Sequence, residues 1–292
     1  MDRDKFKFPN QILPYLLVLP QVVVVLIFIV FPTFESFRMS TYMSDAFGHG
    51  RVFVGLENYI DLLTSTEYQQ TIIVTLIFTL AVTFIGLALG LMISLLLNRK
   101  IKGLSFYRTA LIWPYALSPA VVGAIWMFLF HPSYGVLTYI SPLYLNWLER
   151  GSHALILLII AAIWRNLGYN IAFYLAGLQN IPQNLLEAAS IDGAGAIGRF
   201  RKIIFPLISP TTFFLFTMNL IYAFYQIFGL VHTVTKGGPG GATNVMVYSA
   251  YRDGVTHLMP GFSAAQSVIM FVIAVGLVYL QFKYAQRGVY YA

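Results

Sequence analysis

Polar side chains gather at helical spacing within one long apolar stretch of the sequence, residues 153–177. Arg165 and Tyr169 are four residues apart, as are Asn166 and Asn170, so each pair would share one face of a helix. A guanidinium can bind phosphate through two parallel hydrogen bonds, and amide and phenol groups can bind hydroxyls. These four residues therefore predict a binding site for a solute that carries hydroxyl groups and an anionic group.

A second set of polar side chains lies in the apolar stretch 204–228. Asn219, Tyr222 and Gln226 follow one another at intervals of three and four residues, which places them on one helical face. Gln266 contributes a further amide from the last apolar stretch. We expect these groups to extend the same solute route, because polar side chains inside apolar helices favour a cavity. A second interpretation stays open, in which they bond to one another or to a partner chain across a helix interface.

Both stretches belong to a chain with too little charge for a water-soluble fold. Of its 292 residues, 10% are charged and 58% are hydrophobic, so its apolar surface exceeds what one globular core can bury. Windows of about 20 residues with almost no charge are long enough to cross a bilayer as helices. We therefore predict an all-α membrane protein with a single transmembrane domain over residues 1–292. Its six transmembrane helices are predicted near 12–32, 71–97, 106–130, 153–177, 204–228 and 262–282.

The first predicted span follows Arg3, Lys5 and Lys7, as a secretory signal would. It is longer than the apolar region of a signal and has no small-residue cleavage site, so we expect an uncleaved helix. Proline lacks the backbone N–H that a helix interior needs. We therefore expect Pro14 and Pro20 to kink or unwind the start of this helix.

Positive charge is distributed unevenly between the predicted loops. The two termini and the connections 98–108 and 178–203 together carry twelve Lys and Arg residues, whereas the remaining loops, 33–70, 131–152 and 229–261, carry five. Because cytoplasmic loops are the positive ones, we predict that both termini are cytoplasmic. The same clusters suit anionic membrane lipid as a partner, and we expect no nucleic-acid partner.

The sequence lacks the residue sets that define several functional classes. It contains no cysteine, and its five histidines have no metal-ligand spacing, so we expect neither a disulfide nor a metal site. No convergent set of acid, base and nucleophile indicates an enzyme, so we predict no catalytic residue. The phosphate-binding motif of ATPases is absent, so ATP hydrolysis would need another chain. An ion-driven secondary transporter is a minor alternative, because none of the eleven acidic residues lies inside a predicted span.

The connection 178–203 carries the signals of a short amphipathic helix. Pro182 suits the first turn of a helix, and Gly193 suits the left-handed residue that follows a helix end. The intervening residues predict a helix of about three turns, which would lie flat on the cytoplasmic side. Its small pair, Ala188 and Ala189, and the charge of Glu187 would suit a docking surface, although an ordinary amphipathic connector has the same composition.

This connection resembles the Glu-Ala-Ala loop of binding-protein-dependent ABC importer permeases. The resemblance rests on residues 187–189, Gly193 after three further residues, Ile203 after nine more, and Phe205 followed by Pro206. The family usually has Leu before the final Pro, and Phe205 keeps the bulk and apolarity of that position. The resemblance implies that a group of residues docks into an ATPase subunit and couples its movement to transport. That group is Glu187, Ala188, Ala189, Asp192, Gly193 and Pro206.

Further stretches resemble the carbohydrate-importer permeases related to the maltose system, among them residues 53–59, 178–182 and 235–239. Residues 113–116 and 219–224 are most similar to the first permease subunit of sn-glycerol-3-phosphate importers. A disaccharide or oligosaccharide stays open as the alternative solute.

This resemblance also implies the partners and the cellular location of the chain. The partners are a second homologous permease, a dimer of ATPase subunits that bind ATP and magnesium, and an external solute-binding protein. The chain itself would carry no cofactor, would lie in the bacterial inner membrane and would work by alternating access. The Gly-rich residues 235–241 are expected to form a flexible loop that contacts the binding protein.

Overall fold

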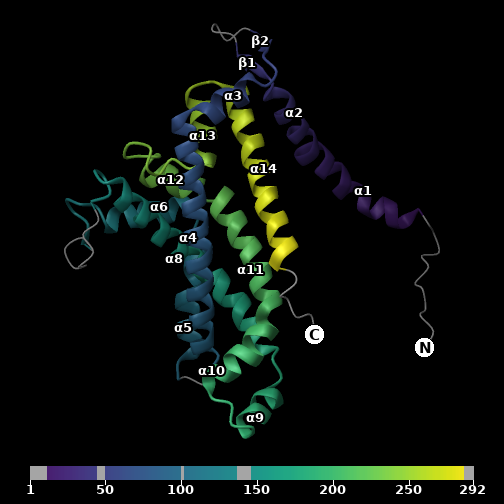
Figure 1. The fold of residues 1–292 in the computed structure, drawn as a ribbon, viewed down its shortest axis with the longest axis vertical. Coiled ribbons are helices and arrows are strands. Elements are labelled where there is room, and N and C mark those ends of the chain that lie inside the picture. The colour runs from purple at the N-terminus through teal and green to yellow at the C-terminus, as the bar shows by residue number, and fades with distance from the viewer. Residues whose placement is uncertain (1–11, 45–49, 100–101, 137–145, 286–292) are drawn as a thin grey trace.

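The computed structural model describes residues 12–44, 50–99, 102–136 and 146–285. These residues are mostly helical, with one short β-hairpin, and most of the long helices stand side by side as a bundle (Figure 1). The helices are α1 Leu13–Val25, α2 Phe31–Met39, α3 Glu57–Thr64, α4 Thr66–Leu97, α5 Leu104–Ile112, α6 Pro119–Leu129, α8 Gly151–Gln179, α9 Gln183–Ile191, α10 Ala196–Arg199, α11 Phe205–Tyr225, α12 Phe228–Val234, α13 Met246–Tyr251 and α14 Pro260–Ala285.

Five helical stretches of the described residues are long and apolar enough to cross a membrane, and a bent helix pair makes a sixth candidate. The prediction of a helical membrane protein is confirmed. The five stretches are Leu13–Met39, Thr66–Leu97, Gly151–Gln179, Ala196–Tyr225 and Pro260–Lys283.

The span predicted near 106–130 is a bent helix pair in the structure. The pair Leu104–Ala116 and Pro119–Leu129 is bent by 107°. Proline disfavours helical backbone in the residue before it, and Ser118, which precedes Pro119, is extended, with ψ 151°. The Ser118 hydroxyl accepts a hydrogen bond from the N–H of Val121 and so caps α6 after the bend.

The first helix is not unwound at its start, where Pro14 and Pro20 were expected to kink or unwind it. Pro14 lies in the first turn of α1, where a helix needs no N–H donor, and the helix continues through Pro20. A wide π-helical turn, Leu26–Val30, lies further along, immediately before α2. No side chain of α1 is buried, and Figure 1 shows this helix directed away from the bundle.

The centre of the bundle is the contact between α4 and α8. Gly86 and Gly90 of α4 face Asn170 of α8, and a Cβ built on Gly90 would lie only 2.7 Å from the Asn170 Cβ. The absence of side chains at these glycines lets the two helices approach closely. Buried Phe78 and Leu157 extend the same contact along the bundle.

The bundle end that carries α3 is covered by a hairpin of β1 Tyr42–Ser44 and β2 Arg51–Phe53, and we call it the hairpin end. Residues 235–241, which the sequence predicted to be a flexible loop, form a hydrogen-bonded turn with the residues up to Asn244 at this end. Thr243 donates to the Gly238 carbonyl at 2.6 Å. Asn244 donates to the Thr71 hydroxyl of α4 at 3.0 Å, which fixes the turn to the bundle.

Candidate substrate route and coupling segment

Arg165 lies on α8 where the bent pair α5–α6 crosses it. Its Nε donates to the Leu117 carbonyl at 2.8 Å, an acceptor that the bend has released from helical bonding. Its guanidinium lies 5.6 Å from the ring centre of Tyr115 and 5.4 Å from that of Tyr222, within the range of cation–π attraction. Its Nη1 is buried and makes no hydrogen bond within the described residues. The group therefore ties the bend to α8 and keeps an unused donor.

Tyr115 was missed by the sequence analysis as a site residue. It belongs to a 3₁₀ turn, Trp113–Ala116, at the bend, and its ring lies 5.3 Å from that of Tyr169 on α8. Periodicity cannot identify such a residue, because it lies outside regular helix. The available signal was an aromatic residue directly after Pro114, inside the predicted span 106–130.

Three asparagines form a buried cluster between α8 and α11. Asn219 donates to the Asn170 Oδ1 at 2.7 Å and to the Leu215 carbonyl at 2.7 Å. Its own Oδ1 accepts from Asn166 at 2.8 Å and from Asn170 at 3.2 Å. A primary amide has two donor hydrogens and two acceptor lone pairs, so the hydrogen-bonding capacity of Asn219 is filled. In this conformation the cluster holds the two helices together.

The remaining polar residues of the predicted route occupy different surroundings. Tyr222 is buried and donates to the Ala162 carbonyl of α8 at 3.3 Å. Gln226 is exposed at the end of α11. Gln266 is buried in α14 and donates to the Asp253 carboxylate near the hairpin end. The structure thus brings Tyr169 and Tyr222 near Arg165 and does not bring the two glutamines there.

The predicted coupling segment contains a helix of nine residues, α9. Asp192 is its C-cap residue, and Gly193 follows with φ +80°, the left-handed conformation that favours glycine. Glu187 and Ala188 are exposed, whereas Ala189 is partly buried. Figure 1 shows α9 projecting from the bundle at the end opposite the hairpin, which we call the α9 end.

The segment returns to the bundle through α10 and a second π-helical turn, Phe200–Ile204. Pro206 is the second residue of α11 and lies directly after this turn, so its missing N–H falls where the helix changes from π to α spacing. Arg199 donates from Nη1 to the Ser190 hydroxyl at 2.8 Å and so links α10 back to α9. The segment is therefore connected to α8 at one end and directly to α11 at the other.

Residues 86–289 match the family described as the binding-protein-dependent transport system inner membrane component. The chain belongs to this family. The matched part of this inner membrane component contains α8, α9 and α11, so both groups of predicted site residues lie within it.

Three relatives of this inner membrane component are similar over nearly its whole length, and each is an sn-glycerol-3-phosphate transport system permease protein UgpA. That of Rhizobium meliloti (strain 1021) is 44% identical over 97% of this chain and 98% of its own length. That of Agrobacterium fabrum is 45% identical with the same coverage. That of Yersinia enterocolitica is 41% identical over the full length of both chains.

Two solved structures share the fold of this inner membrane component. One is a bacterial alginate ABC transporter in complex with an alginate pentasaccharide-bound periplasmic protein, with a TM-score of 0.82, 21% identity and 94% of each chain covered. The other is a bacterial ABC transporter involved in the import of alginate, with a TM-score of 0.78, 22% identity and coverage of 94% of this chain and 95% of that one. At this identity the likeness establishes the fold.

Proposed function

We propose that this chain is the transmembrane permease subunit of a binding-protein-dependent ABC importer for sn-glycerol-3-phosphate. The observation that carries the proposal is the identity of 41% to 45% with UgpA permeases over almost the entire chain. The chemistry of Arg165 supports the same solute, because a guanidinium with an unused donor suits a phosphate group. Tyr115 and Tyr169 stand beside it and offer hydroxyls to a polyol.

The proposed mechanism is alternating access driven by a partner ATPase dimer, which binds ATP and magnesium. The segment of α9 docks into this dimer through Glu187, Ala188 and Ala189. Its direct connection to α11 carries the movement into the bundle, with Asp192, Gly193 and Pro206 at the turns. A nucleotide-driven change of this kind requires that the dimer bind the two conformations of α9 with different affinity.

The proposed movement opens the asparagine cluster inside the bundle. Separation of α8 from α11 breaks the hydrogen bonds that join Asn166 and Asn170 to Asn219. The released amides then face a widening route next to Arg165 and can bind the hydroxyls of the solute. In this proposal the same side chains close the route in one state and bind solute in the other.

A second homologous permease is the proposed partner of α1. This helix belongs to an apolar stretch of 27 residues that buries none of its most apolar window in its own chain. A neighbouring transmembrane helix would cover part of that surface, and lipid the rest. An external solute-binding protein would deliver the solute at the hairpin end, with both termini in the cytoplasm.

The decisive experiment is an ATPase assay of the complete transporter in lipid nanodiscs. Binding protein loaded with glycerol-3-phosphate is expected to stimulate hydrolysis, whereas binding protein offered maltose is not. Stimulation by the disaccharide alone would keep the importer and overturn the solute, whereas stimulation by neither would overturn both.

The proposed orientation has a separate test, because the chain contains no cysteine and single cysteines can be added without background. Gln183 at the α9 end and Thr256 at the hairpin end are both exposed. A membrane-impermeant maleimide added to intact cells should label the Thr256→Cys variant and leave Gln183→Cys unlabelled. The opposite pattern would overturn the orientation.

A further inference from the structure

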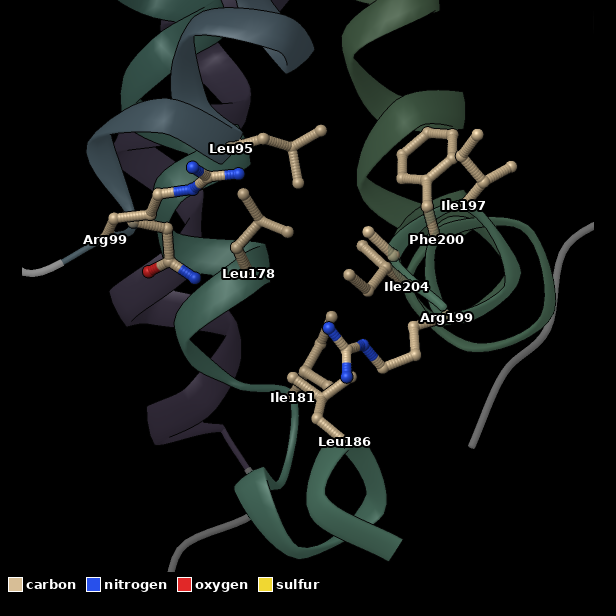
Figure 2. Close-up of a pocket in the computed structure, with 11 residues that line it drawn as sticks. Leu95, Arg99, Leu178, Ile181, Leu186, Ile197, Arg199, Phe200 and Ile204 are labelled. Carbon is tan, nitrogen blue, oxygen red and sulfur yellow. The ribbon is translucent and has the colours of Figure 1, made fainter. Parts of the chain in front are cut away.

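A pocket of about 390 Å³ lies at the α9 end, between the coupling segment and the ends of α4 and α8 (Figure 2). Most of its wall is apolar. Leu95 of α4, Leu178 of α8 and Leu186 of α9 contribute to it, together with Phe200 and Ile204 of the π-helical turn. The pocket therefore touches both the transmembrane bundle and the segment that we propose to dock into the ATPase.

Two guanidinium groups line this apolar pocket. Arg99 reaches it from the end of α4 and Arg199 from α10, on opposite walls (Figure 2). Arg199 bonds to the Ser190 hydroxyl, and neither arginine forms an ion pair within the described residues. The amide of Asn98 adds a neutral polar group to the same wall as Arg99. Two positive charges thus stand beside an apolar cavity, and no carboxylate in the described part of the chain pairs with them.

We propose that this pocket binds one anionic phospholipid, with its phosphate between Arg99 and Arg199 and an acyl chain against the leucine wall. The apolar wall distinguishes this ligand from free phosphate, which would gain nothing from it. The location fits a lipid as well, because α4 and α8 end beside the pocket, at Leu97 and Gln179. Basic pockets between transmembrane helices on the cytoplasmic side are known to take anionic head groups.

The bound lipid would join the coupling segment to the bundle, a consequence that rests on the proposed function. Leu95 belongs to α4 and Arg99 lies just after its end, whereas Arg199 and Phe200 belong to the segment that follows α9. A lipid held by both sides transmits displacement between them. Coupling of ATP hydrolysis to transport is then expected to depend on anionic lipid.

The first test measures lipid binding alone, without nucleotide or solute. Native mass spectrometry of the complete transporter, titrated with phosphatidylglycerol, should show one tightly bound lipid. The double variant Arg99→Gln, Arg199→Gln should weaken this binding by about thirtyfold, because each cation contributes about fivefold. Lys102→Gln with Arg201→Gln is the matched control, since it removes two cations that do not line the pocket. Equal losses in both double variants would overturn the site and leave only a general charge effect.

A steric variant separates the pocket from its charges. Ala196→Trp places a large ring at the pocket wall, on an exposed position, and keeps both arginines. It should exclude the lipid, and full lipid binding by this variant would contradict the proposal. Binding of inorganic phosphate with the same affinity as phosphatidylglycerol would also overturn it.

The second test compares solute-stimulated ATPase activity in nanodiscs of phosphatidylcholine alone and with phosphatidylglycerol. Wild type should respond to phosphatidylglycerol by several-fold, and the Arg99→Gln, Arg199→Gln variant should not respond. If the wild-type transporter bound the lipid as expected but solute stimulated its ATPase activity in neither membrane, the result would count against the importer function and not against the pocket. Lipid binding without a lipid effect on wild-type coupling would overturn the proposed regulatory role.

Discussion

The guanidinium of Arg165 lies 5.4 Å from the ring centre of Tyr222, so a cation–π contact joins α8 to α11 in the middle of the bundle. If this guanidinium binds the phosphate of the solute, Arg165→Gln should reduce glycerol-3-phosphate uptake by about tenfold or more, since hydrogen bonds to charged groups contribute about 1.5–3 kcal/mol. Arg165→Lys keeps the charge and should retain part of the activity. Both variants are compared with the wild type by measuring glycerol-3-phosphate uptake in cells that contain the complete transporter. If the Arg165→Gln variant took up glycerol-3-phosphate as fast as the wild type, the role of Arg165 would be purely structural.

The asparagine cluster predicts an effect on stability. Asn219→Leu removes the partner of Asn166 and Asn170, and each amide left unpaired in the bundle should cost about 1–3 kcal/mol. The purified protein should then unfold at a lower temperature in a fluorescence thermal-shift assay. Gln226→Leu makes a similar amide-to-leucine change at an exposed position and should leave the transition unchanged. Similar transitions for the two variants would contradict the assigned bonding.

The left-handed conformation of Gly193 predicts a position-specific effect on coupling. No atom lies within 4 Å of a Cβ added at Gly193 or Gly195, so space does not distinguish them. Only Gly193 has a positive φ, where alanine costs about 1–2 kcal/mol and asparagine less. Gly193→Ala should lower the ratio of transport to ATP hydrolysis in proteoliposomes, whereas Gly195→Ala and Gly193→Asn should preserve it. An equal effect of the two alanine variants would show that the turn conformation is not the cause.

The exposed carboxylate of Glu187 predicts uncoupling without unfolding. Glu187→Lys reverses the charge on the surface of α9 that we propose to dock into the ATPase. It should abolish transport-coupled ATPase activity and leave the unfolding temperature of the purified chain unchanged. Gln183→Lys adds a positive charge one turn earlier on the same helix, keeps Glu187, and controls for added charge alone. Full coupled activity of the Glu187→Lys transporter would remove Glu187 from the docking surface.

The close approach of α4 and α8 predicts a steric effect at Gly90. A Cβ at this position would lie 2.7 Å from the Asn170 Cβ, so Gly90→Ala must push the helices apart and should cost about 1–3 kcal/mol. Gly276→Ala in α14 meets no atom within 4 Å and should not destabilise the protein. Thermal unfolding of the two variants gives the comparison. A stable Gly90→Ala variant would mean that the helices do not pack at this distance.

Long runs with almost no charge predicted α4 and α8 well. The ranges 71–97 and 153–177 differ from α4 and α8 by at most five residues at either end. The same signal missed the bend of 107° within 106–130, because hydropathy does not report direction. The information was present in Pro119, whose effect on the preceding residue ends the regular helix.

The candidate site was predicted as a set of helical faces and not as a set of contacts. Spacing placed Asn166 and Asn170 on one face of α8, and the structure keeps them together. Spacing within one helix cannot identify the partner on another, so it left open whether these amides line a cavity or bond to Asn219. Gln266 shows the same limit, because its buried partner, Asp253, is supplied by a segment expected to be an outer loop.

The first helix adds nothing to the interior of its own chain, since no side chain of α1 is buried. The bundle of α4, α8, α11 and α14 can therefore be completed before α1 has a neighbour. A copy of the chain without its partner would expose this apolar helix to the proteases that remove unassembled membrane proteins, and binding of the proposed partner would cover it. If the second permease that we propose covers α1, exposure of this helix marks a subunit that has not been assembled, and the lifetime of the lone subunit should be shorter than that of the complex.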